Sequence, residues 1–148
     1  MGVKRECSKV LLVDEQDRVL LFSGIDRTKP HVPPWWFPVG GALELDETPV
    51  DAAIRETQEE TGLTIADPGP VVFRRSFSWD FEGKDYDQEE WFFLVRVDCF
   101  TPASNAWTDT EAATIRGTRW WSIEELRSTD QDVFPEDLPD QLERLLSR

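Results

Sequence analysis

Short apolar runs separated by polar turns recur along the chain and predict a β-sheet. These runs are rich in β-branched and aromatic residues, which is typical of strands. Six of them predict strands: Lys9–Val13, Arg18–Ser23, Trp35–Val39, Val71–Trp79, Glu89–Val97 and Ile115–Trp121. The first two runs flank a polar stretch of four residues, so we expect them to form a β-hairpin.

The segments between the apolar runs predict loops and turns. Gly24–Pro34 contains three prolines and one glycine, which excludes regular structure there. Gly40-Gly41 predicts a turn directly after the third strand. Asp80–Gln88 predicts an acidic loop or hairpin turn, and Thr101–Thr110 predicts a linker loop.

A helix is predicted over Thr48–Thr61. Thr48 or Glu47 is suited to cap it, Pro49 fits the first turn, and Gly62 is a typical stop. The helix face expected to pack on the sheet, which is only partly apolar, carries the following side chains: Val50, Ile54, Thr57 and Thr61.

Two further helices are predicted near the C-terminus. Ser122 is placed to cap a short helix over Ile123–Arg127, and Asp137–Leu146 carries a leucine stripe at helical spacing. Strands and helices follow one another without strict alternation. This order predicts an α/β fold in which helices cover both sides of a mixed sheet.

Composition limits the class of protein. The 148 residues fit one domain spanning 1–148, and a hydrophobic content of 39% can fill one core. A net charge of −14 disfavours binding to nucleic-acid polymers and anionic membranes. The sequence shows neither a signal peptide at its start nor an apolar run long enough to span a membrane. Cys7 and Cys99 form no CxxC pair, which favours a cytoplasmic location, and His31 alone cannot build a zinc site of histidines and cysteines.

Three glutamates share one face of the predicted central helix. Glu56 lies three and four residues before Glu59 and Glu60, so the three side chains are neighbours, with Arg55 beside them. Like charges at this spacing repel by roughly 0.2–0.5 kcal/mol per pair. A bound cation removes the repulsion, and Mg²⁺ prefers carboxylate and phosphate oxygens. The pattern therefore predicts a magnesium site that takes a phosphorylated substrate.

The stretch around these glutamates resembles the Nudix box. The box reads Gly, five residues, Glu, seven residues, then Arg-Glu-U-x-Glu-Glu-x-Gly-U, where U is a bulky aliphatic residue. Gly41, Glu47 and the run Arg55–Leu63 match it, except that Thr57 stands where an aliphatic residue is usual. The order of elements outside the box also resembles a complete MutT-like pyrophosphohydrolase domain over nearly the whole chain.

This resemblance implies a fold, an activity and a set of partners. The fold would be an α/β/α sandwich with a mixed sheet. The activity would be hydrolysis of a nucleoside diphosphate linked to another group, usually with Mg²⁺ and sometimes with Mn²⁺. The partner would be a small nucleotide rather than a polymer or membrane, and relatives are often homodimers.

The resemblance also assigns roles to residues. Glu56, Glu59 and Glu60 would hold the metal, and a backbone carbonyl at Gly40 would face it. Glu59, Glu56 and Arg55 would form the catalytic group, with Arg55 orienting a glutamate by an ion pair. Which acid acts as general base stays open.

Candidate substrate contacts lie on both sides of the box. Glu89 or Glu90 is a further candidate for ligand or base, and we expect Glu90, Trp36 and Arg27 to contact the substrate. Aromatic residues that could stack on a base are Trp35, Trp36, Phe37, Trp79 and Phe81. Basic candidates for the phosphates are Arg5, Arg18, Arg27, Lys29, Arg74 and Arg75.

Several readings of the function stay open. The region Ser78–Phe81 lacks the proline of ADP-ribose hydrolases and the tyrosine of dinucleoside polyphosphate hydrolases, so it does not select a substrate. The main alternative is a catalytically inactive Nudix-fold protein that binds nucleotides or regulates. An acidic metal buffer and an isomerase on the same fold have less support. The intact glutamates favour an enzyme.

Overall fold

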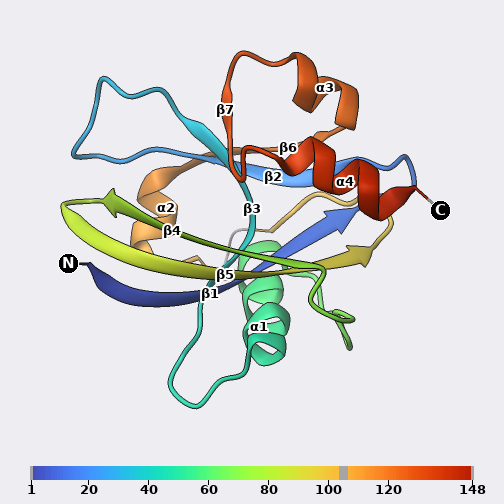
Figure 1. Cartoon of the computed structure of the whole chain (residues 1–148), viewed down its shortest axis with the longest axis horizontal. Helices are drawn as coiled ribbons and strands as arrows, with labels where there is room; N and C mark the ends of the chain where they lie inside the picture. The colour runs from blue at the N-terminus through green and yellow to red at the C-terminus, as the bar shows by residue number, and fades with distance from the viewer. Residues whose placement is uncertain (1, 104–106, 148) are drawn as a thin grey trace.

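A seven-stranded mixed sheet organises the protein in the computed structural model, which describes residues 2–103 and 107–147 (Figure 1). The strands are β1 Val3–Val13, β2 Val19–Gly24, β3 Trp35–Ala42, β4 Phe73–Phe81, β5 Lys84–Arg96, β6 Ile115–Trp121 and β7 Asp132–Val133. The helices are α1 Pro49–Thr61, α2 Asp109–Thr114, α3 Ile123–Ser128 and α4 Leu138–Leu146. Among the described residues, none of these helices is long and apolar enough to cross a membrane.

The sheet has the order β4-β5-β1-β2-β3-β7, with β6 beside β2 and an extra pairing of β1 with β3. β1 runs parallel to β5, and β3 runs parallel to β7, while the other pairs are antiparallel. The predicted hairpin of β1 and β2 is confirmed. Asp14 fixes its turn, because its Oδ1 accepts the backbone N–H groups of Gln16 and Arg18 at 2.9 Å each.

Two apolar clusters lie on opposite faces of the sheet, because successive side chains of a strand point to opposite sides. On one face, Val10 and Leu12 of β1 belong to a cluster that includes Ala53 of α1. On the other face, Leu11 of β1 belongs to a cluster that includes Leu138 of α4. Figure 1 shows α1 on one side of the sheet, with α3 and α4 on the other. The predicted mixed sheet with helices on both sides is therefore confirmed.

The central helix begins and ends where the sequence predicted. Thr48 caps α1 through a capping box, and Gly62 ends it in a left-handed conformation (φ 81°). The predicted packing face was wrong at Val50, which is 40% exposed. The buried positions of α1 are small or polar: Ala52, Ala53, Glu56, Thr57, Glu60 and Thr61. Helix α1 thus turns two of its glutamates toward the sheet.

The predicted turn at Gly40-Gly41 was wrong, because both glycines lie inside β3. Gly40 has φ 145°, and a Cβ built on it would come within 2.0 Å of the Ser8 carbonyl oxygen of β1. A Cβ on Gly41 would come within 2.6 Å of the Glu56 carboxyl group. The glycines therefore allow β3 to approach β1 closely and leave room for a carboxylate.

Other predicted boundaries also moved. The acidic segment Asp80–Gln88 is mostly strand, because β4 and β5 meet in a tight turn in which Glu82 and Gly83 have positive φ. The alternation of exposed and more buried residues along β4 and β5 was not recognised in the sequence, because many of the exposed positions carry charged side chains. The predicted linker Thr101–Thr110 contains the start of α2, and its residues 104–106 lie outside the described part. The predicted helices near the C-terminus are confirmed, with Ser122 as the cap of α3.

Replacing Gly40 with alanine should destabilise the fold strongly. The added Cβ meets backbone rather than a flexible side chain, and φ is in a region that L-residues avoid, so we expect a loss of at least about 2 kcal/mol. Urea denaturation measures the loss. Gly117→Ala is the matched control, because nothing lies within 4 Å of a Cβ there. Equal stability of the two variants would contradict the packing described for β1 and β3.

Candidate active site

Arg55 of α1 ties the start of the helix to its glutamates. Its Nε and Nη2 bind the two carboxylate oxygens of Glu47 at 2.7 and 2.8 Å. Its Nη1 donates to Glu56 at 2.7 Å and to Glu59 at 2.9 Å, and Nη2 also donates to the Ala42 carbonyl at 2.9 Å. These five bonds match the five N–H groups of a guanidinium. Arg55 in turn lowers the pKa of Glu47.

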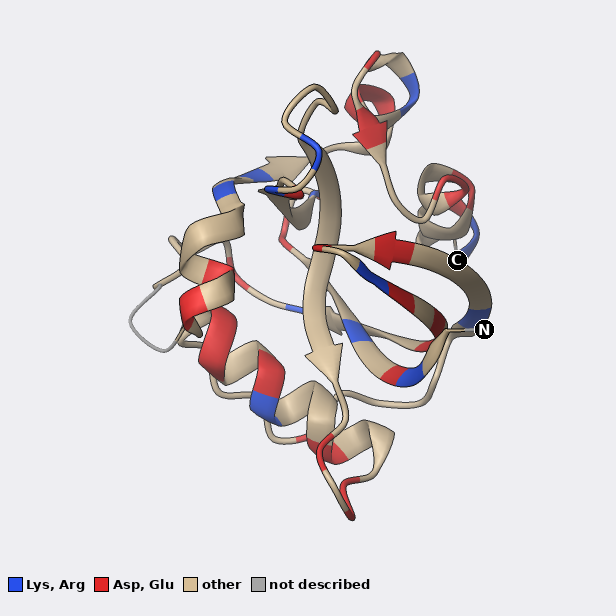
Figure 2. Cartoon of the chain, turned by 90° about the vertical axis from the view of Figure 1, so that its left-hand side faces the viewer, with Lys and Arg blue, Asp and Glu red and all other residues tan. Residues whose placement is uncertain are grey.

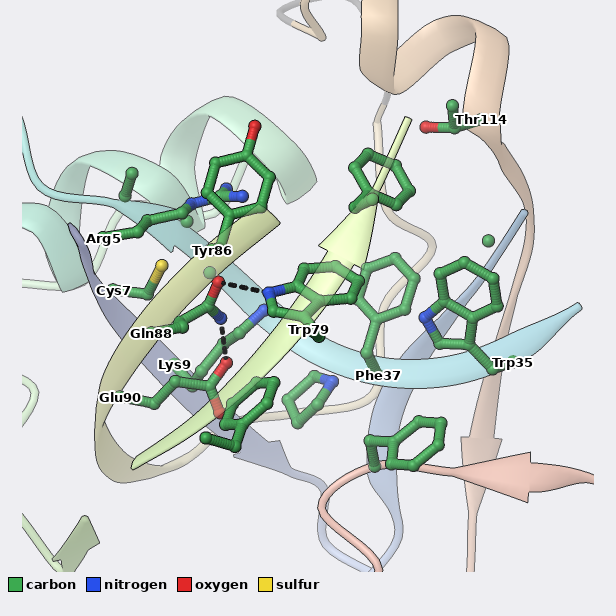
Figure 3. A pocket seen from close by; sticks show the side chains of 18 of the residues that line it. Arg5, Cys7, Lys9, Trp35, Phe37, Trp79, Tyr86, Gln88, Glu90 and Thr114 are labelled. Carbon is green, nitrogen blue, oxygen red and sulfur yellow. Dashed lines mark hydrogen bonds between the residues drawn. The ribbon is translucent and has the colours of Figure 1, made fainter. Parts of the chain in front are cut away.

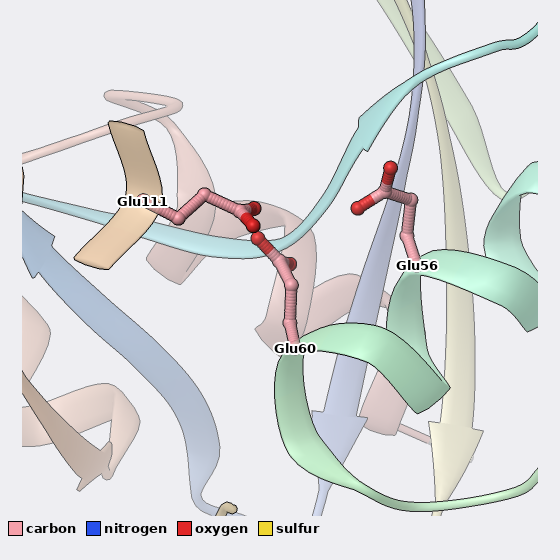
Figure 4. Close-up of side chains that lie close together, drawn as sticks. All are labelled: Glu56, Glu60 and Glu111. Carbon is pink, nitrogen blue, oxygen red and sulfur yellow. The ribbon is translucent and has the colours of Figure 1, made fainter. Parts of the chain in front are cut away.

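Three carboxyl groups converge above the glycines of β3. Glu56 and Glu60 lie one turn apart on α1, and Glu111 comes from α2 (Figure 4). One oxygen from each lies within 4.8 Å of the others. Glu60 is 2% exposed, and its Oε1 accepts the N–H of Gly40 at 2.7 Å. The cluster therefore joins two elements that are distant in sequence.

The third predicted ligand, Glu59, lies outside this cluster. Its side chain is 39% exposed, and its carboxylate is bound by Arg55. At Gly40, the group directed at the cluster is the N–H that binds Glu60, whereas the sequence suggested a carbonyl. The structure thus brings together Glu56 and Glu60, and adds Glu111 in place of Glu59.

The electrostatics of the cluster favour a cation. Burial raises the pKa of Glu60 well above its usual value, and the neighbouring Glu111 and Glu56 raise it further. Burial also raises the pKa of Glu56, against the opposing effect of Arg55. The donor set consists only of carboxylate oxygens, which suits a hard divalent ion such as Mg²⁺ or Mn²⁺. The residues present therefore fit the metal that the sequence predicted.

Glu111 is held in place by contacts with Thr108, which lies near the end of the predicted linker Thr101–Thr110. Its backbone N–H donates to the Thr108 hydroxyl at 3.1 Å, and its Oε1 accepts the Thr108 N–H at 2.9 Å. The indole of Trp107 donates to the Glu60 carbonyl at 2.9 Å, which docks this segment on α1. The signal in the sequence was the capping-box pattern Thr-x-x-Glu.

The carboxylates face a cavity of about 1280 Å³ over the sheet. Strands β1, β3, β4 and β5 contribute lining side chains, among them the aromatic residues Trp35, Phe37, Trp79 and Tyr86 (Figure 3). The rings of Trp79 and Phe81 stack with centroids 5.2 Å apart, and Trp35 meets Phe81 edge-on at 6.2 Å. Phe37 lines the same cavity. One cavity thus combines an acidic cluster with a surface for a flat ring.

The predicted substrate contacts divide between the two faces of the sheet. Glu90 lines the cavity and is 4% exposed, whereas Glu89 is paired with Arg74 and does not line it. The predicted contact of Trp36 with the substrate is corrected. Its indole donates to Gln131 at 2.8 Å and its ring packs against the core, while its neighbours in β3 line the cavity. The reason is the alternation of side chains along β3.

The predicted contact of Arg27 with the substrate is corrected as well, because Arg27 pairs with Glu82 and does not line the cavity. The basic candidates that line it are Arg5, Lys29 and Arg75, whereas Arg18, Arg27 and Arg74 lie outside. Lys9, which sequence reasoning missed, also lines it, with Nζ 5.4 Å from the centre of the Phe37 ring. Acidic residues are spread over helices, strands and loops in Figure 2, whereas these basic side chains line the cavity and could bind phosphate oxygens.

Several polar contacts at the edge of the cavity join the loop after β2 to the turn between β4 and β5. Asp26 is 3% exposed and accepts the backbone N–H groups of Thr28 at 2.8 Å and Glu82 at 2.9 Å. Lys29 binds Asp80 at 2.6 Å. We call these residues, with the Arg27–Glu82 pair, the loop clasp. Although burial opposes ionisation, hydrogen bonds from Thr28 and Glu82 lower the pKa of Asp26 to about 2, so the clasp should weaken only as the pH falls from about 4 toward 2.

A family profile described as the NUDIX domain matches residues 4–142. The chain belongs to the NUDIX domain family. The RNA pyrophosphohydrolase of Vibrio atlanticus (strain LGP32) is 28% identical over 120 residues, which cover 68% of this chain and 65% of that protein. The dihydroneopterin triphosphate diphosphatase of Haemophilus influenzae (strain ATCC 51907 / DSM 11121 / KW20 / Rd) is 36% identical over 73 residues, covering 49% of this chain and 43% of that protein.

Solved structures confirm the expected fold of the NUDIX domain. The MutT NUDIX hydrolase from Burkholderia pseudomallei superposes with a TM-score of 0.67 at 17% identity, over 96% of this chain and 98% of that one. The match to the curated relatives spans less than two thirds of their length. Their names also differ in the molecule acted on, so family membership leaves the substrate of this NUDIX domain open.

Removing the charge of Glu60 should stabilise the metal-free NUDIX domain. Because the pKa of Glu60 is raised on folding, the unfolded chain ionises first, and stability falls as the pH rises above about 4.3 toward the raised value. Glu60→Gln keeps an acceptor for Gly40 and should increase the free energy of unfolding at pH 7.5.

Denaturant titrations between pH 5 and 8 without metal measure this effect. Glu59→Gln is the control, because its side chain is more exposed and lies outside the cluster. The interpretation would be wrong if Glu60→Gln were less stable than the parent at pH 7.5.

Breaking the loop clasp should expose the loop to protease. Asp26→Asn replaces one acceptor oxygen by a donor that cannot bind the backbone N–H groups, so the loop should open. Trypsin should then cleave after Arg27 about tenfold faster than in the parent, which corresponds to one lost hydrogen bond, whereas Lys29 is followed by Pro30 and resists trypsin. Mass spectrometry identifies the cut, and Asp140→Asn, which removes an exposed ion pair with Arg127, is the control.

Proposed function

We propose that this NUDIX domain hydrolyses a phosphoanhydride bond in a nucleotide, with Mg²⁺ held by its buried carboxylates. The observation that carries the proposal is the convergence of Glu56, Glu60 and Glu111 within 4.8 Å at the wall of a cavity. Burying acids together is unfavourable in a protein that holds no cation there. Mn²⁺ fits the same oxygen donors.

The roles follow from position and charge. Bound Mg²⁺ would neutralise phosphate oxygens and lower the pKa of water. Glu60 and Glu111 would hold it, because both are fixed by backbone contacts. Glu56 faces the same point, and its raised pKa suits proton acceptance from water as well as ligation. Glu59 would reach the cluster only after leaving Arg55, which otherwise orients both glutamates.

The cavity supports a free nucleotide as substrate. Lys9 and Arg5 line it and supply donors for phosphate oxygens, while the aromatic side chains offer a stacking surface for a base. The net charge of −14 argues against a long nucleic acid, although one relative is named for RNA. A nucleoside triphosphate or a nucleoside diphosphate derivative fits this combination.

The second candidate function is binding of nucleotides without turnover. The partial exposure of Glu59 and its pairing with Arg55 favour it, since one box glutamate is then absent from the cluster.

The cellular location and the oligomeric state of the protein also stay predictions. Cys7 and Cys99 are free thiols, which agrees with the proposed cytoplasmic location, and light scattering would test the expected homodimer.

Removing a metal-holding carboxylate should abolish turnover while preserving the fold. For Glu60→Gln and Glu111→Gln we expect kcat to fall at least about 100-fold, because even residues that only support metal ligands cost 10–100-fold. A panel of nucleotides with Mg²⁺, scored for phosphate or pyrophosphate release, measures the loss, and EDTA should reproduce it.

Glu124→Gln removes an exposed glutamate of α3 and should keep parental activity. Nucleotide binding without product release from any member of the panel would support the non-catalytic alternative. Parental activity in both cluster variants would refute the assignment of the site.

A further inference from the structure

The floor of the cavity carries a chain of polar side chains that the proposed mechanism does not use. The Trp79 indole donates to Gln88 Oε1 at 3.0 Å, and Gln88 Nε2 donates to Glu90 Oε2 at 2.6 Å (Figure 3). Arg75 Nε lies 2.9 Å from Glu90 Oε1. We call these four residues the floor network. Gln88 and Glu90 are 6% and 4% exposed, and both line the cavity.

Strand register places the floor network beside the acidic cluster. Glu90 is paired with Arg75 of β4 and with Cys7 of β1, and Cys7 is paired in turn with Ala42 of β3, next to the glycines. In the β4–β5 ladder, Gln88 is paired with Phe77. Trp79 lies two residue pairs farther along, opposite Tyr86. A ligand that meets the carboxylates through its phosphates and extends along the cavity would bring its ring over these side chains.

The tryptophan fixes which atoms the network presents to a ligand. An indole N–H can only donate, so Gln88 must turn its oxygen toward Trp79 and its NH₂ group toward Glu90. Gln88 then keeps one N–H for a ligand. Glu90 accepts a hydrogen bond from Gln88 and forms an ion pair with Arg75, and its remaining lone pairs can only accept. The floor thus offers one donor next to a pair of acceptor oxygens.

We propose that this floor selects guanine among the bases, an inference that rests on the proposed function. The guanine edge presents O6 as an acceptor, followed by the N1–H and N2–H donors, which complements one donor from Gln88 and two acceptors from Glu90. Hypoxanthine lacks the second donor. On the same edge, adenine, cytosine and uracil each offer donors from only one nitrogen. Glu90 and Gln88 are the residues that determine specificity, and Trp79 is a positioning residue that sets the orientation of Gln88.

Base preference tests the proposal directly. With Mg²⁺, kcat/KM should be at least about tenfold higher for GTP than for ITP and ATP, because a polar site rejects an analogue that leaves its groups unpaired. Calorimetric titration with GMP, IMP and AMP measures the same preference without turnover. Trp79→Phe keeps an aromatic ring but removes the N–H, so Gln88 can flip and the ratios should fall toward one.

Trp36→Phe is the matched control, because the same change there affects a tryptophan on the opposite face of the sheet, bound to Gln131. It should keep the parental ratios. Turnover of all three triphosphates at equal kcat/KM, or unchanged ratios in Trp79→Phe, would overturn the inference and leave the proposed hydrolysis standing. Tighter binding of GMP than of IMP and AMP, with no triphosphate cleaved, would support the inference and refute the hydrolysis.

Discussion

Burial of negative charge is the constraint on which the rest of this NUDIX domain depends. Glu60 has almost no access to water, and its carboxylate is stabilised by one backbone N–H from Gly40. Arg55 meets part of the electrostatic cost by binding three glutamates at once. The remaining repulsion is what a divalent cation relieves, so the site is organised around a charge that its own side chains do not supply.

The alternation of side chains along the strands determines which residues line the cavity together with the buried glutamates. Alternation along β3 sends Trp35 and Phe37 into the cavity and Trp36 into the opposite core. The same alternation along β5 separates Glu90 from Glu89. Acidic, aromatic and hydrogen-bonding side chains can therefore share one face while an apolar cluster packs beneath the other.

The sequence was sufficient for features governed by local rules. The caps of α1 at Thr48 and Gly62 and the strand that ends at Trp121 depend on nearby residues, so they were predicted with correct positions. Glu111 was missed because its role depends on docking against α1 through Trp107, a contact between distant segments. The glycines of β3 were misread for the same reason: the partner that forbids a Cβ is Ser8, on another strand.

The separation of the three acids along the chain bears on synthesis. Glu56 and Glu60 leave the ribosome well before Glu111, because α1 precedes α2 by four dozen residues or so of chain that includes β4 and β5. Glu111 joins them only when α2 has been made. The three acids can therefore be buried together only after strands β1 to β5 have been translated, and the full set of carboxylates exists only in a chain whose sheet is nearly complete.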